Sequence, residues 1–236
     1  MDFKHQGIRK LKLDVVNGEE VLRIVKAVID DKDKIDILVN NAGTNCAGAL
    51  LDIPDDAINS TFDINTYAAL RLAKAVFPHM AARKRGVIIN IGSIVEHTPT
   101  PWNGIYSASK AALRSISDVL WQELKPFNIS VIHVSAGQIR SNIAKKSFAA
   151  GVHMSDDSLY KPFADVITQR ILFSQSATAM PTDEFATRIV AASLRPHPPR
   201  NIWLGGMSWM FWFMTWLPRT WALSYLWILF CKIRNK

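Results

Sequence analysis

Cysteine is nearly absent from this chain of 236 residues, which contains only Cys46 and Cys231. Two cysteines cannot form the multiple-disulfide framework of a small secreted domain, so an intracellular, reducing compartment is expected. The first residues contain no apolar stretch, and we therefore expect no secretory signal. The longest apolar region, residues 207–231, is interrupted by Pro218 and Arg219, so it lacks the continuous run of about 20 apolar residues that spans a bilayer.

The composition, 49% hydrophobic and 20% charged, excludes a disordered chain, and the length suffices for one α/β domain with a full core. The formal net charge is +8, and most of the excess lies in residues 138–236, which hold 12 basic and 5 acidic residues. These basic residues are scattered, which argues against a nucleic-acid-binding patch. An anionic membrane surface or a phosphate-bearing substrate fits their distribution better.

Strand-like apolar runs alternate with helix-length segments, a pattern that predicts an α/β, Rossmann-like, doubly wound parallel sheet. Strands are predicted at residues 8–15, 35–40, 86–91, 129–134 and 201–204. Helices are predicted at residues 19–31, 60–83 and 106–125, and from an N-cap at Thr182 to about residue 194. We interpret the polar, interrupted segment 138–180 as a loop and helices over a substrate cleft. Residues 1–206 would form this domain and residues 207–236 a separate hydrophobic tail.

The pair Tyr106 and Lys110 is the main candidate for chemistry, because residues four apart project from one face of a helix. A lysine ammonium held there favours the phenolate and lowers the tyrosine pKa, which suits acid–base catalysis. Ser93 follows the predicted strand 86–91 and so lies where open α/β sheets place their sites. Taken singly, each feature has a plain structural reading: the Tyr-Lys spacing recurs by chance, and a serine after a strand is often a turn residue.

The joint pattern of Asn-Asn-Ala-Gly at residues 40–43, Phe-Asp-Ile-Asn at 62–65, Ser93, Tyr106 and Lys110 resembles the short-chain dehydrogenase/reductase family. The resemblance covers residues 8–206 and is greatest to fungal NADPH-dependent 1-acyldihydroxyacetone-phosphate reductases and related secondary-metabolism reductases. It implies that Tyr106 exchanges a proton with the substrate oxygen, Ser93 holds that oxygen, and Lys110 lowers the tyrosine pKa and binds the nicotinamide ribose. Asn65 matches the asparagine that anchors a relay water, although a local backbone-binding asparagine is the plainer reading.

The resemblance also implies a cofactor, NADP(H), with NAD(H) not excluded, and no metal. The residues that it places against the cofactor are Asp14, Asn41, Gly43, Arg71, Tyr106, Lys110, Ile139 and Ser141. Asn41 and Gly43 would approach the adenosine ribose, and Ile139 and Ser141 the nicotinamide carboxamide. Asp14 would meet the adenine ring. A solvated surface position fits Arg71 equally well.

The sequence departs from the family at its amino end, where members have a strand and a Thr-Gly-x-x-x-Gly-x-Gly turn that holds the pyrophosphate. Seven residues precede the predicted strand 8–15, so the first strand, first helix and second strand are expected to be missing, which would expose a sheet edge. Ala136-Gly137 also replaces the family's Pro-Gly. Two interpretations follow: a truncated form of an active reductase, or a catalytically impaired, membrane-associated binding or regulatory protein derived from one.

The tail contains five of the eight tryptophans and ends in a basic segment. Tryptophan favours the headgroup level of a bilayer, so a monotopic hairpin or a pair of interfacial helices is predicted. The protein would then lie at an endoplasmic reticulum or lipid-droplet surface, or otherwise in the cytosol, and take a lipophilic small-molecule substrate. The alternative is a carboxyl-terminal helix that packs on a partner in a homo-oligomer.

Overall fold

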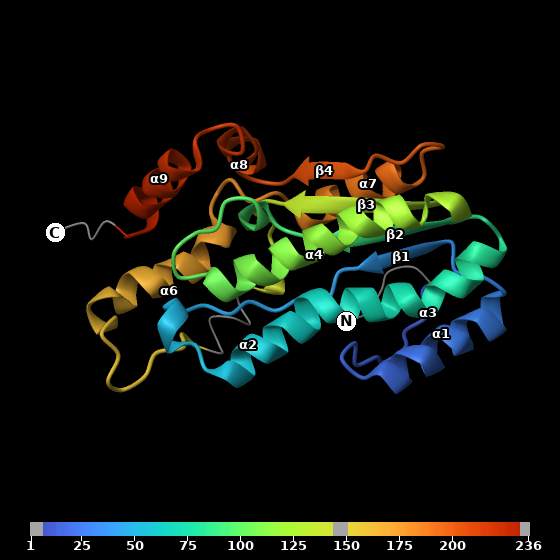
Figure 1. Ribbon diagram of the computed structural model, residues 1–236, viewed down its shortest axis with the longest axis horizontal. Helices are drawn as coiled ribbons and strands as arrows, with labels where there is room; N and C mark the ends of the chain where they lie inside the picture. The colour runs from blue at the N-terminus through green and yellow to red at the C-terminus, as the bar shows by residue number, and fades with distance from the viewer. Residues whose placement is uncertain (1–6, 144–150, 232–236) are drawn as a thin grey trace.

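A sheet of four parallel strands lies at the centre of the molecule, in the order β1-β2-β3-β4 (Figure 1). The computed structural model describes residues 7–143 and 151–231. The strands are β1 (Ile37–Asn40), β2 (Gly86–Ile91), β3 (Ile129–Ala136) and β4 (Asn201–Leu204). Since all four point the same way, their carboxyl ends meet at one edge of the sheet. The predicted α/β, Rossmann-like fold class is confirmed.

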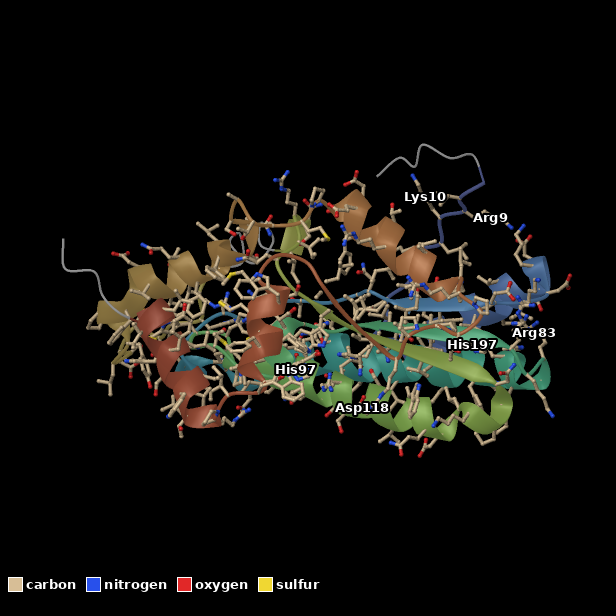
Figure 2. All side chains as sticks on the ribbon, turned by 90° about the horizontal axis from the view of Figure 1, so that it is seen from above. Arg9, Lys10, Arg83, His97, Asp118 and His197 are labelled. Carbon is tan, nitrogen blue, oxygen red and sulfur yellow. The ribbon has the colours of Figure 1, made fainter. Side chains whose placement is uncertain are left out.

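Alternate residues of the central strands face two different helical layers, as the two-residue period of a strand requires. Ile88 and Val131 pack in one cluster with Val21, Val25 and Val76. These partners belong to α1 (Gly18–Lys32) and α3 (Ala68–Ala82). The next residues along β2 and β3 face the opposite cluster, with Ile189 of α7 (Thr182–Ser193). Figure 2, viewed from above, shows the sheet between these layers.

The predicted helix over 60–83 is part of a longer helical run that begins at Asp55. It consists of α2 (Asp55–Phe62), a π-helical turn (Asp63–Tyr67) and α3, and it lies alongside α4 (Gly104–Glu123) (Figure 1). Pro78 lies inside α3. The N-cap of α7 is Pro181 rather than Thr182, because the Thr182 hydroxyl donates to the Arg140 carbonyl and so does not cap the helix. Short 3₁₀ turns occupy Leu50–Asp52, Ile94–Glu96, Lys125–Phe127, Lys161–Phe163 and Phe173–Gln175.

The strand predicted at residues 8–15 is wrong: residues 8–14 have no regular secondary structure. Apolar alternation yields a strand only where a sheet edge accepts its backbone hydrogen bonds, and the described ladder begins at Ile37. Ile8 and Leu11 are about half exposed, at 46% and 50%. Leu13 packs instead against the cluster between α1 and α3. In the described part of the chain, β1 is therefore an edge strand, with Val39 half exposed.

The tail folds as two short helices, α8 (Ser208–Met214) and α9 (Arg219–Cys231), which meet at the Pro218-Arg219 interruption. One face packs on the domain: Phe211, Leu226 and Phe230 share a buried cluster with Val95 and Trp102. The opposite face exposes Trp209, Trp212, Trp216, Trp221, Tyr225 and Trp227. Among the described residues, no helix is both long and apolar enough to cross a bilayer. The division into residues 1–206 and 207–236 remains a prediction.

Candidate active site

The carboxyl ends of β1, β2 and β3 open onto a cavity of about 610 Å³. Its walls come from the loops after these strands and from α4, α6 (Ala164–Leu172) and α8. Seven of the residues predicted from the sequence line it: Asn41, Gly43, Ser93, Tyr106, Lys110, Ile139 and Ser141. These residues come from four segments of the chain, so the fold brings together what the motifs only suggested.

Lys110 lies one turn beyond Tyr106 on α4, with its Nζ 5.9 Å from the centre of the Tyr106 ring. The Nζ donates a 2.8 Å hydrogen bond to the Ile91 carbonyl at the end of β2. Lys110 is buried, and burial lowers its pKa to about 8, with the Glu96 carboxylate partly opposing this effect. The lysine is thus fixed beneath the cavity with its ammonium directed at a backbone carbonyl.

The pKa of Tyr106 is raised above its ordinary value, in contrast to the lowering expected from the Tyr-Lys spacing. Burial raises it most, and the Glu96 charge adds to the effect. A hydrogen bond with Ser93 and the positive charge of Arg170 oppose this rise. The Lys110 ammonium is directed at the Ile91 carbonyl, and it does not outweigh the effect of burial on Tyr106. Tyr106 therefore keeps its proton at neutral pH and can serve as a proton donor.

Ser93 caps the 3₁₀ turn Ile94–Glu96 through a reciprocal capping box. The Ser93 N–H donates to Glu96 Oε2 at 2.9 Å, and the Val95 N–H donates to Ser93 Oγ at 3.4 Å. These bonds position the serine backbone after β2 while its hydroxyl reaches Tyr106. Glu96 was not singled out from the sequence, although the Ser-x-x-Glu spacing is the signal that could have found it.

The Glu96 carboxylate is buried and charged, so hydrogen bonds must offset the cost of removing its charge from water. Its Oε1 lies 2.8 Å from His133 Nε2 and accepts a 2.6 Å bond from the Ser135 hydroxyl. Burial alone would raise the Glu96 pKa, but hydrogen bonds from His133 and His97 outweigh it and lower the value to about 2. Gly92 is required beside this group, because a Cβ there would collide with the Glu96 carboxylate and the His133 ring.

Asn65 lies in the π-helical turn between α2 and α3, a feature that is frequent at functional sites. Its Oδ1 accepts from the Thr44 N–H at 2.8 Å, and its Nδ2 donates to the Thr44 carbonyl and the Ser109 hydroxyl at 2.9 Å each. The side chain therefore ties the loop after β1 to α4. A Cβ on Gly43 would lie 3.3 Å from Asn65 Oδ1 and 3.5 Å from Lys110 Nζ, so Asn65 lies directly behind the cavity wall.

Two predicted cofactor residues do not line the cavity. Asp14 is exposed before α1, where its Oδ1 accepts from the Val16 N–H. Arg71 donates to the Val15 carbonyl and to the Asp63 carboxylate, each at 2.9 Å, and so holds the start of α1 against the helical run. Arg170 of α6 lines the cavity but was missed, since no sequence motif marks it.

The comparisons with known proteins agree with this fold. A solved short-chain dehydrogenase from Streptomyces avermitilis superposes with a TM-score of 0.71 at 28% identity, covering 85% of this chain and 72% of that one. A short-chain dehydrogenase from Burkholderia cenocepacia, solved in complex with NADP, gives a TM-score of 0.70 at 23% identity over 92% and 77% of the two chains. The second likeness speaks for the fold alone.

Curated relatives extend the likeness to sequence. A short-chain dehydrogenase of Neurospora crassa is 33% identical over 91% of this chain and 73% of its own length. An NADPH-dependent 1-acyldihydroxyacetone phosphate reductase of Schizosaccharomyces pombe is 31% identical over 69% of this chain and 56% of its own length. The family model described as short chain dehydrogenase matches residues 3–151. With more than half of the chain matched by that model, and with the cavity built from the motifs described above, this protein belongs to the short-chain dehydrogenase family.

Proposed function

We propose that this protein is an NADP(H)-linked reductase that converts the ketone of a lipophilic substrate into a secondary alcohol. The observation that carries the proposal is the meeting of Ser93, Tyr106 and Lys110 at one cavity, at the carboxyl ends of parallel strands. The protonated state of Tyr106 favours the direction of reduction, in which the substrate oxygen gains a proton. Relatives that are named NADPH-dependent reductases support the choice of cofactor.

In this mechanism the Ser93 hydroxyl and the Tyr106 hydroxyl both donate to the substrate carbonyl oxygen. Tyr106 then gives up its proton as negative charge develops on that oxygen. Bound NADPH supplies the hydride that the carbonyl carbon requires. Lys110, whose pKa of about 8 leaves it mostly charged at neutral pH, stabilises the tyrosinate that remains and can donate to the nicotinamide ribose.

The residues around the cavity fit the nicotinamide end of such a cofactor. Gly43 keeps the wall open in front of Asn65 and Lys110, where a side chain would fill the space. Ile139 and Ser141 line the opposite wall, after β3. We propose these residues, with Asn41, as the cofactor contacts. The contribution of Asp14 and Arg71, which lie outside the lining, remains a prediction.

The lining also favours a lipophilic substrate. Ile94, Val95, Phe173, Phe185 and Phe211 supply apolar surface beside the catalytic tyrosine. An acyl-dihydroxyacetone-phosphate-like lipid, or a terpenoid or polyketide ketone, would meet this surface, and the relative named as a 1-acyldihydroxyacetone phosphate reductase supports the first of these classes.

Two buried hydrogen-bond acceptors in the cavity wall favour a ligand that also carries hydrogen-bond donors. The Oδ1 atoms of Asn45 and Asn103 are buried and have no hydrogen-bond partner among the described residues. Both asparagines line the cavity, so a hydroxyl or amide of a bound ligand can satisfy them.

We also propose that the outer face of α8 and α9 binds an anionic membrane surface, at the endoplasmic reticulum or a lipid droplet. Trp209, Trp216 and Trp221 are each more than two-thirds exposed, and Arg219 is the first residue of α9. Co-sedimentation with vesicles of phosphatidylcholine and phosphatidylserine tests this proposal, with Trp216→Ser/Trp221→Ser as the variant expected to stay in the supernatant. Concentration-dependent dimerisation that the same variant abolishes would instead assign this face to a second copy.

The enzymatic proposal is tested by replacing Tyr106 with phenylalanine, which keeps the ring and removes the proton. We expect the rate of NADPH oxidation with a ketone substrate to fall by a factor of about 10² to 10⁴. Tyr225→Phe is the matched control, because Tyr225 is an exposed residue of α9, and it should retain the wild-type rate. A Tyr106→Phe enzyme with more than a tenth of the wild-type rate would contradict the assignment. Wild-type protein that gives no change on titration with NADPH would favour a non-catalytic binding protein.

A further inference from the structure

Arg170 lines the same cavity as Ser93 and Tyr106 but takes no part in the mechanism above. Its guanidinium is held from two sides. The Nε and one Nη both donate to the Thr100 hydroxyl, at 3.2 and 2.7 Å. The group also stacks over the rings of Phe230 and Phe173, with its central carbon 4.9 and 5.6 Å from their centres. The orientation of Arg170 is thus fixed before any ligand arrives.

The charge of Arg170 is not balanced by the described residues. Within residues 7–143 and 151–231, no carboxylate lies within 4.0 Å of the guanidinium, and its contacts are one hydroxyl and two aromatic rings. Burial lowers the pKa of Arg170 to about 10, and the charge that Tyr106 carries when it is ionised opposes this effect. Arg170 is partly buried at the cavity wall and has no anionic partner among the described residues, so an anion bound there would gain charge-assisted hydrogen bonds.

Tyr106 and Arg170 line the same cavity and influence each other electrostatically, so an anion at the guanidinium would share the cavity with the carbonyl that Tyr106 protonates. Two of its five N–H groups are engaged by Thr100, and a planar fork of this kind suits the paired oxygens of phosphate or carboxylate.

We propose that Arg170 binds an anionic group of the substrate, so that the preferred ketone carries a phosphate or a carboxylate near its carbonyl. This inference rests on the proposed function, because it places the anion relative to the carbonyl that Tyr106 protonates. The cavity then has three parts: a proton-donating end, an apolar wall for a hydrocarbon chain, and a cationic corner. An amphiphilic oxo-lipid with a charged head matches all three.

Two substrate pairs test the proposal in the full-length protein. The first pair is 1-palmitoyl-dihydroxyacetone phosphate and 1-palmitoyl-dihydroxyacetone, which differ only in the phosphate. The second pair is 4-oxopalmitic acid and its methyl ester, which differ in the carboxylate. We expect the wild-type kcat/KM to be at least tenfold higher for the anionic member of one pair, and that pair identifies the anion. Arg170→Met should reduce this ratio by about 10- to 100-fold, mainly through KM.

Two further variants separate anion binding from a structural role. Arg170→Lys keeps the charge but loses the planar fork, so it should retain part of the preference. Arg188→Gln removes an exposed arginine of α7 that pairs with Glu184, and it should leave the ratio unchanged. If Arg170→Met lowers kcat/KM equally for both members of each pair, then Arg170 only supports the fold and the proposal is wrong.

A binding measurement without NADPH keeps this inference separate from the reductase assignment. Isothermal titration with the same four compounds should show tighter binding of one anionic member to the wild-type protein but not to Arg170→Met. Such a difference in a protein that reduces none of the ketones would support the anion site and overturn the proposed function. Equal binding of charged and neutral members by the wild-type protein would overturn the anion site, whatever the turnover.

Discussion

Replacing Glu96 by glutamine removes the buried charge that positions Ser93, while changing the size of the side chain little. Its two oxygens accept from the Ser93 N–H and the Ser135 hydroxyl, and one lies beside the His133 ring. The amide can offer only one oxygen, so its NH₂ group must face one of these partners. A buried donor is then left without an acceptor, and the charge-assisted bonds are lost.

The size of the effect follows from the pKa of Glu96. A value of about 2 in the folded protein, against 4.5 for the ordinary side chain, corresponds to roughly 3 kcal/mol of folding stability. Because the folded pKa is the lower one, this stability is fully present above pH 4.5 and is lost as the pH falls towards 2. At pH 7, Glu96→Gln should therefore reduce the free energy of unfolding by about 3 kcal/mol, and the Tm by about 6–12 °C for a chain of this size.

Urea unfolding of the wild type and the variant, followed by tryptophan fluorescence at several pH values, measures this difference. The gap should be largest near pH 7 and should narrow between pH 4.5 and 2, because the wild type alone loses its charge there. Glu123→Gln, at the exposed end of α4, is the control and should change stability by less than about 0.5 kcal/mol. A gap below about 1 kcal/mol at pH 7, or one that does not vary with pH, would refute the reasoning.

Two other substitutions probe the residues behind Tyr106. Lys110→Met should abolish ketone reduction yet raise the free energy of unfolding at pH 7 by about 1–2 kcal/mol. The shift of the Lys110 pKa from 10.5 to about 8 costs the wild type roughly 3 kcal/mol, and the loss of the hydrogen bond to the Ile91 carbonyl offsets part of the gain. Since the Lys110 pKa is lower in the folded protein than in the unfolded one, the stability of the wild type rises between pH 8 and 10.5. Urea unfolding should therefore show a smaller difference in the free energy of unfolding between the variant and the wild type at pH 10 than at pH 7. A variant less stable than the wild type at pH 7 would contradict this prediction. Asn65→Ala should lower stability by about 3 kcal/mol in the same assay, since three buried hydrogen bonds to Thr44 and Ser109 are lost, and a loss below about 1 kcal/mol would mean that they contribute little.

The strands that could be predicted most accurately are short apolar runs with a glycine or proline at both ends. The strand over 86–91 and the strand over 201–204 match β2 and β4, because glycines or prolines flank short apolar runs there. Residues 8–15 show the same alternation but form no strand, since pairing depends on a neighbour that the local sequence does not specify. The π-helical turn at Asp63–Tyr67 had no such marker either, and its position depends on the packing of Asn65 against α4.

The sequence predicted several of the residues that line the cavity, but not the electrostatics of the site. Ser93, Tyr106 and Lys110 meet because a strand end and a helix face are both readable from sequence. The spacing of Tyr106 and Lys110 could not show how deeply Tyr106 is buried, and burial raises its pKa where the spacing predicted a lowered one. Arg170 lies in α6, and its place in the cavity wall with Tyr106 depends on the packing of α6 against α9, which no local signal in the sequence specifies.

The inner face of the two tail helices packs on the domain, whereas their outer face is exposed. On the inner face, Phe211 lines the substrate cavity and Phe230 supports Arg170, while the Phe230 carbonyl accepts a 3.2 Å bond from the Trp102 indole. The Arg219 guanidinium also donates to the carbonyl of His97, which lies next to these helices (Figure 2). Under the two proposals above, substitutions on the inner face would alter substrate choice, and substitutions on the outer face would alter membrane binding. The tail helices, residues 208–231, would then tune which ketones the proposed reductase accepts separately from α4, the helix that carries Tyr106 and Lys110.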